Sequence, residues 1–192
     1  MQVEGTLGTI PARKIDSAMQ AKLRKLSRCF MVGMDEVEFV GGSITLSFRV
    51  DNSGKVEWVF VQASTIGHRG TEQCILTEAG RTAFPTPKGG TGAEFTWGFA
   101  MDSAGDIRPP VDWGADRIAS SITGASALAA CPGGGRHEVT AYVAPGGAVM
   151  AAGVASDSQQ AATAADCIVD AVRGLAFPDP GSYAAKVSFP VD

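Results

Sequence analysis

The stretch that decides the fold is CILTEAGRTAFPTP, residues 74–87. Ninety-three positions later it returns as CIVDAVRGLAFPDP, residues 167–180, with the cysteine, the Phe-Pro pair and the final proline at the same spacing. Self-similarity at a fixed period indicates two copies of one structural unit. In each copy the pattern predicts a short helix that begins near the cysteine and ends before the Phe-Pro pair, because the residue before a proline disfavours the α region. We expect Phe84 and Phe177 to turn back into the core there.

The length and composition fit a chain of two small domains. The 192 residues allow two domains of about 90–100 residues, close to the commonest domain size. The repeat places the first domain at 1–102 and a second, divergent copy at 112–192. Residues 103–111, which include a pair of prolines, are predicted to be a linker.

Each copy is predicted to run helix, strand, strand, helix, strand. In the first copy the expected elements are a short strand at 3–10, a helix over 15–30, strands over 44–50 and 55–64, a helix with Thr71 as its N-cap, and a closing strand over 93–101. In the second copy they are a helix over 112–131, a hairpin over 138–154, a helix over 160–173 and a closing strand over 185–191. The fold class is therefore α+β, with a three-stranded antiparallel sheet and two helices in each copy.

The cysteines divide evenly between the copies. Cys29 and Cys74 belong to the first, and Cys131 and Cys167 belong to the second. Their spacing matches no zinc-binding pattern. An even count in each copy suggests one disulfide per domain, and buried free thiols are the alternative. Disulfides imply an oxidising compartment.

The charge and hydropathy patterns argue against several classes of partner. A net charge of −4 disfavours nucleic acid as the main partner. The basic stretch from Arg13 to Arg28 is interpreted as the solvated face of a helix rather than a binding patch. No apolar run reaches the roughly 20 residues that a membrane span needs, and the first residues lack a signal-peptide core. We therefore expect a piece of a longer exported or anchored protein, attached to a membrane only through an upstream segment.

A search for catalytic constellations predicts no catalytic, metal or cofactor site. His68 and His137 lie in predicted loops that contain glycine, which favours ordinary surface residues. The carboxylates of Asp35, Glu36 and Glu38 are interpreted as solvated. Neither a G-x-S-x-G nor an H-E-x-x-H motif occurs, nor does a dinucleotide-binding fingerprint. The sequence therefore predicts a protein that is not an enzyme.

Comparing the copies assigns the faces of the strand around Trp58 and Phe60. The equivalent positions in the second copy hold Ala151 and Gly153, whereas Val61 is matched by Val154. Truncating a buried aromatic side chain to alanine costs about 3–5 kcal/mol. We infer that Trp58 and Phe60 lie on the outer face, with Val59 and Val61 inside. Adjacent exposed aromatics indicate an interface, and cover by the second copy of the same chain is the alternative.

These pieces together resemble a known domain family. The matching segments are residues 8–15, 29–30, 51–56, 63–67, 74–75 and 84–87. They are similar to the AgmX/PglI C-terminal domain, which in turn resembles the C-terminal domain of TonB. The resemblance covers about 3–102 well and 112–192 more loosely, since Pro132 follows its cysteine where an aromatic is usual.

The resemblance implies a non-catalytic periplasmic module of an envelope-spanning complex, such as a TonB-like or gliding-motility assembly. In TonB-like domains a partner peptide pairs with the open edge of the small sheet. The candidate edges here are the closing strands 93–101 and 185–191, with side chains for a partner at Phe95, Trp97, Phe99, Val187 and Phe189. The alternation of the three aromatics also favours core packing. The remaining alternatives are a self-assembling module or homodimer that uses Trp58 and Phe60, a peptidoglycan-binding module, and a divergent hydrolase.

Overall fold

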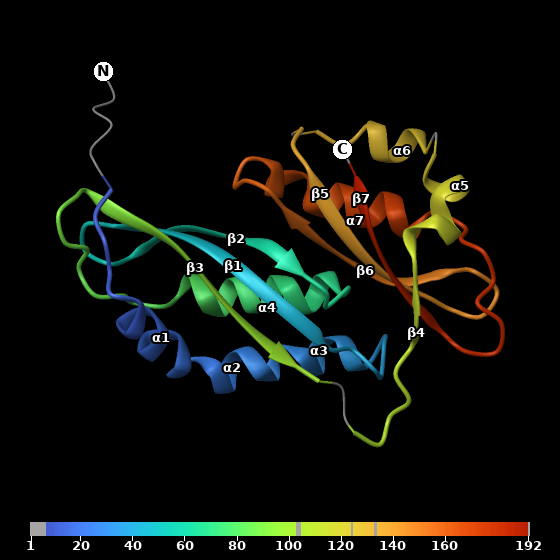
Figure 1. The fold of residues 1–192 in the computed structure, drawn as a ribbon, viewed down its shortest axis with the longest axis horizontal. Helices are drawn as coiled ribbons and strands as arrows, with labels where there is room; N and C mark the ends of the chain where they lie inside the picture. Colours follow the sequence, from blue (N-terminus) through green and yellow to red (C-terminus); the bar gives the residue numbers. More distant parts are fainter. Residues whose placement is uncertain (1–6, 103–104, 124, 133, 192) are drawn as a thin grey trace.

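The computed structural model describes residues 7–102, 105–123, 125–132 and 134–191. The chain is an α+β protein in which two sheets lie in succession, each accompanied by helices (Figure 1). Of the strand expected at 3–10, residues 3–6 lie outside the described part. The rest forms only a single bridge, between Thr9 and Lys88.

The first sheet has the antiparallel strand order β2-β1-β3. Its strands are β1 (Gly42–Asp51), β2 (Val56–Ser64) and β3 (Gly92–Met101). The alternation that predicted β1 is confirmed, because Leu46 and Phe48 are fully buried while Thr45, Ser47 and Arg49 are only partly buried. The core of this half lies between that face of the sheet and the helices (Figure 1).

The helix expected over 15–30 is three shorter helices. These are α1 (Ala12–Gln20), α2 (Leu23–Arg28) and α3 (Phe30–Met34). The N–H of Lys22 bonds to the carbonyl of Met19, and that of Cys29 bonds to Leu26, so two tight turns interrupt the α-helical register. Met19 and Leu26, on either side of the first turn, are both fully buried in the first core. The periodicity predicted the buried face correctly but not the breaks.

The second sheet has four strands, three of which, β6-β5-β7, are paired antiparallel in the same order as β2-β1-β3. Its order is β4-β7-β5-β6, with β4 (Val111–Trp113), β5 (His137–Val143), β6 (Val149–Ser156) and β7 (Ala185–Val191). The helices of this half are η1 (Ala115–Ile118), α5 (Ala119–Ile122), α6 (Ser126–Ala129), η2 (Ala161–Ala164) and α7 (Ala165–Arg173).

The linker and the helix predicted for residues 103–131 are corrected. Val111, the last residue of the predicted linker, begins β4, and the predicted helix 112–131 is reduced to single turns. Among the residues of this segment that the structure describes, Ile118 alone is fully buried, so no continuous apolar face stabilises a long helix. The helix predicted over 160–173 is largely confirmed, because η2 and α7 together cover most of that range.

Phe84 and Phe177 fill the core, as predicted. Both are 5% exposed. The N–H of Phe84 donates to the carbonyl of Gly54 at 2.9 Å, and the N–H of Phe177 donates to Gly147 at 2.9 Å. The Phe-Pro exit of each helix is thus held against the hairpin turn of its own sheet. This pair of bonds gives a physical reason for the recurrence of the opening stretch.

Replacing Gly54 with alanine is expected to lower the free energy of unfolding by about 2 kcal/mol. Gly54 has a φ of +86°, and a Cβ there would collide with the carbonyl oxygen of Phe84. Gly89 is the matched control, since its φ is +81° and nothing lies within 4 Å of its Cβ position. Gly89→Ala should cost only the backbone strain, about 1 kcal/mol. If urea denaturation gave equal losses of unfolding free energy for the two variants, the contact between residue 54 and Phe84 would not contribute to stability.

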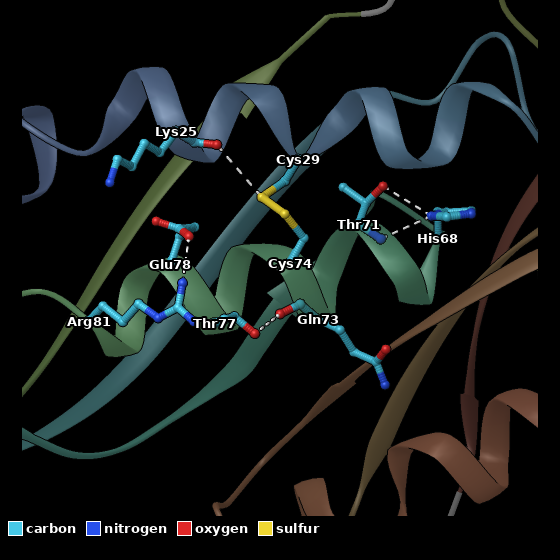
Figure 2. Close-up of a disulfide and its surroundings, with 9 residues drawn as sticks. All are labelled: Lys25, Cys29, His68, Thr71, Gln73, Cys74, Thr77, Glu78 and Arg81. Carbon is cyan, nitrogen blue, oxygen red and sulfur yellow. Dashed lines mark hydrogen bonds and ion pairs between the residues drawn. A yellow bond between two sulfur atoms is a disulfide. The ribbon is translucent and has the colours of Figure 1, made fainter.

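Both expected disulfides are present. Cys29 is bonded to Cys74 and Cys131 to Cys167. Figure 2 shows the first bond joining the α2–α3 junction to α4 (Arg69–Gly80). Two disulfides fit an oxidising environment of the periplasmic type.

Candidate partner-binding edge of the first sheet

Strand β3 offers the longest uncovered edge of either sheet. At the other end of the first sheet, β2 lies against β6, which is itself an end strand, and the Thr140 hydroxyl of β5 donates to the carbonyl of Ser64 at 3.2 Å. The outer side of β7 is paired with β4. Within the described part of the chain β3 pairs as a strand only with β1, so its other side is open beyond Gly92, whose carbonyl accepts from the N–H of Gly8.

The register shows which backbone groups of β3 point outward. The carbonyl of Gly92 is turned away from β1, because it accepts from the N–H of Gly8 at 2.7 Å. In an antiparallel pair the direction of these groups alternates along the strand. The pairing with β1 has no bulge, so the N–H and carbonyl groups of Glu94, Thr96, Gly98 and Ala100 also point outward. An added strand would find four donors and four acceptors in regular order.

The aromatic side chains of β3 line the core side of the same edge. Phe95, Trp97 and Phe99 are partly exposed and pack against the first core. Phe95 stacks on Phe48 with ring centroids 5.2 Å apart, and the Trp97 indole N–H donates to Asp16 at 3.2 Å. The prediction that these three share a core-facing side is therefore correct. All three side chains stay partly exposed, and they belong to the strand at the unpaired edge.

The opposite face of β3 is polar and small. Glu94 accepts a hydrogen bond from Arg49 of β1 at 2.8 Å, and Arg49 also bonds Glu57 at 3.2 Å. The hydrogen bond to Glu94 raises the pKa of Arg49. Beyond this network lie the exposed Thr96, Gly98 and Ala100. An added strand would meet aromatic rims on one face and small side chains on the other.

The second candidate edge is corrected. Strand β4 pairs in parallel with the first three residues of β7. Val187 is 1% exposed, and Phe189 is fully buried in the second core. Neither side chain can therefore contact a partner in this fold. Pro190 lies beyond the β4 pairing and is matched only with Glu138 of β5, a position that suits a residue with no N–H to donate.

Trp58 and Phe60 lie on the outer face of the first sheet, opposite Arg49 and Ser47 of β1, while Val59 and Val61 pack against the core. Phe60 is nevertheless only 6% exposed, and its strand β2 lies against β6 of the second half. The structure thus agrees with the alternative in which the second half covers this face. Only Trp58 stays partly exposed.

The two halves are joined by a buried carboxylate that sequence reasoning did not single out. Glu72 of α4 is fully buried, accepts from the Ser64 hydroxyl at 2.7 Å, and accepts from the backbone N–H of Val154 in β6 at 3.1 Å. Burial raises the pKa of Glu72 to about 7. The helical spacing of Glu72 with the buried Ile75 and Ala79 was a signal that could have placed it on the inner face.

The predictions for the two histidines are wrong. His68 is 4% exposed and, in place of Thr71, caps α4, because its Nδ1 accepts from the N–H of Thr71 at 3.0 Å (Figure 2). Burial lowers the pKa of His68. His137 is 6% exposed, and its Nδ1 lies 3.0 Å from the Ser156 hydroxyl. Both imidazoles therefore have structural partners.

The residues that the structure describes contain neither a cluster of three or more metal-ligating side chains nor a helix long and apolar enough to cross a bilayer. Comparisons with known protein families, with curated proteins and with solved structures found no match for the chain.

Proposed function

We propose that this chain is a non-catalytic interaction module that works in the periplasm and binds a partner protein by adding a strand to β3. The observation that supports this proposal most strongly is that, in the part of the chain that the structure describes, β3 alone of β2, β3 and β7 is left without a neighbouring strand on its outer side. The counterpart of β3 is paired with β4, and β2 packs against β6, while β3 is left open. Unpaired edges are usually short, charged or covered, since they otherwise invite pairing with another chain.

The composition of β3 supports a strand-binding role. Its ten residues, GAEFTWGFAM, include one charged residue and no proline, so the edge lacks the usual protection against pairing. Backbone hydrogen bonds in strand addition supply affinity, and pockets for alternate side chains supply specificity. The partly exposed rims of Phe95, Trp97 and Phe99 are suited to the second task.

The disulfides and the resemblance to TonB-like domains support the cellular setting. Two disulfides persist in an oxidising compartment. An envelope-spanning complex, of the TonB-like or gliding-motility kind, would place such a module between membranes. The alternative of self-assembly through Trp58 and Phe60 has less support, because Phe60 is already covered.

Thr96→Pro tests the proposal. The N–H of Thr96 points away from β1, so proline removes an outward donor and leaves the β1 ladder intact. Peptides selected from a random displayed library on the intact protein serve as probes. We expect Thr96→Pro to weaken their binding by at least about tenfold, from one lost hydrogen bond of about 1 kcal/mol plus the clash of the ring.

Thr96→Ala is the control, since it keeps the N–H and changes only an exposed side chain. It should bind the selected peptides like the wild type. Circular dichroism would establish that both variants are folded. Equal binding by Thr96→Pro and wild type would refute pairing at β3.

A further inference from the structure

A dense group of cations lies on the first two helices. Residues 12–28 hold six basic residues and one acidic residue, in a chain whose net charge is −4. The basic residues are Arg13, Lys14, Lys22, Arg24, Lys25 and Arg28. All are exposed except Lys22, which is partly exposed. We call residues 12–28 the basic segment.

The cations of the basic segment are not neutralised within the fold. Among the described residues, none of the six forms an ion pair with a carboxylate. Five arginines elsewhere do form such pairs: Arg49, Arg69, Arg81, Arg136 and Arg173. The only acidic residue of the segment, Asp16, accepts from the indole of Trp97. The positive charge is therefore available to a partner.

The basic segment lies beside the open edge. The bond between Asp16 and Trp97 fixes α1 next to the middle of β3, and Phe30, just after α2, meets the ring of Phe99 with centroids 6.1 Å apart. In Figure 1, α1 and α2 lie below β3, and the C-terminal end of β3 crosses the helices near α2 and α3. Arg13 is one helical turn before Asp16, on the same side of α1. Arg13 thus lies on the side of α1 nearest the aromatic residues of β3, whereas the ammonium group of Lys22 donates to the carbonyl of Arg81 beside α4.

We propose that the basic segment selects an acidic strand as the partner of β3. This inference rests on the proposed strand addition and adds the chemistry of the bound peptide. The strand would place Asp or Glu side chains toward α1 and α2 while its backbone pairs with Glu94, Thr96, Gly98 and Ala100. Long lysine and arginine side chains reach such carboxylates, and complementary charge raises the rate of association and excludes basic competitors.

Peptide selection on two forms of the intact chain tests the inference. The first is the wild type, and the second carries Arg13→Gln, Lys14→Gln, Arg24→Gln, Lys25→Gln and Arg28→Gln, all at exposed positions. We expect Asp and Glu to be enriched at alternate positions of peptides selected on the wild type only. A variant with Arg117→Gln and Arg136→Gln, exposed cations of the second half, is the matched control and should keep the enrichment.

Affinities of one selected peptide and its Glu→Gln version give the size of the effect. At low salt we expect the acidic peptide to bind the wild type at least about tenfold more tightly, with the difference lost in high salt and in the five-residue variant. Equal affinity of the two peptides, with both still sensitive to Thr96→Pro, would overturn the acidic preference and leave strand addition standing. If no peptide depended on Thr96, both would fail.

Binding to anionic vesicles tests whether the basic segment recognises a membrane surface instead of an acidic peptide. The probes are phosphatidylglycerol vesicles and neutral phosphatidylcholine vesicles. We expect no saturable binding of the wild type to either. Binding to the anionic vesicles that the five-residue variant loses, together with selected peptides that tolerate Glu→Gln, would assign the basic segment to a membrane surface and overturn the inference.

Discussion

Replacing Cys29 and Cys74 together with alanine is expected to lower the free energy of unfolding by about 4 kcal/mol. The bond closes a loop with a sequence separation of 45, and the chain-entropy model gives about 4 kcal/mol for a loop of this size. Cys29 is also 1% exposed and belongs to the first core, so truncation removes packed atoms as well. Urea denaturation followed by tryptophan fluorescence measures the loss.

The second disulfide is the control for this experiment. Cys131 and Cys167 are separated by 36 residues, so the entropic contribution is nearly the same. Both are only partly buried, and their loss should remove less packing. We therefore expect Cys131→Ala/Cys167→Ala to cost less than the first pair. A loss below about 1 kcal/mol for the first pair would contradict the structural role given to this bond.

Replacing Glu72 with glutamine is expected to make the protein more stable at pH 8, by an amount on the order of 3 kcal/mol, and to change little at pH 4. Burial raises the pKa of Glu72 to about 7 from an ordinary value of 4.5. A pKa difference of one between the folded and unfolded states corresponds to about 1.4 kcal/mol of stability. The folded state thus favours the protonated carboxyl, which glutamine resembles in shape and charge.

The pH dependence has a defined sign. Because the folded-state pKa is raised, the contribution of Glu72 is fully present below pH 4.5 and is lost as the pH rises through about 7. Asp51, Asp157 and Asp179 have lowered pKa values and act in the opposite direction. The difference between wild type and Glu72→Gln isolates the one group. If the difference in free energy of unfolding between the two proteins stayed constant from pH 4 to 8, a raised pKa of Glu72 would be excluded.

The sequence was sufficient for features that depend on local spacing. Each of three confirmed predictions depends on a pattern that lies within a single copy. They are the alternation in β1, the return of Phe84 and Phe177 to the core, and the two disulfides. The breaks between α1, α2 and α3 did not follow, because no proline or glycine marks them.

Features that depend on contact between the halves were beyond the reach of the sequence. The burial of Glu72 requires β6 to approach α4. Gly153 of β6 makes this approach possible, because a Cβ at that position would collide with the Glu72 carboxylate. The covering of β7 by β4 likewise depends on the path of the connection and not on any motif within it. Because β4 covers β7, only β3 remains of the two strands predicted to bind a partner.

Hydrogen exchange at the amides of β3 is the most direct test of strand addition. In the free protein the N–H groups of Phe95, Trp97 and Phe99 should exchange slowly, because they bond to β1, whereas those of Glu94, Thr96, Gly98 and Ala100 should exchange fast. The account predicts that a selected peptide slows the second set selectively. If a bound peptide left these four amides unprotected, partner binding at β3 would be contradicted.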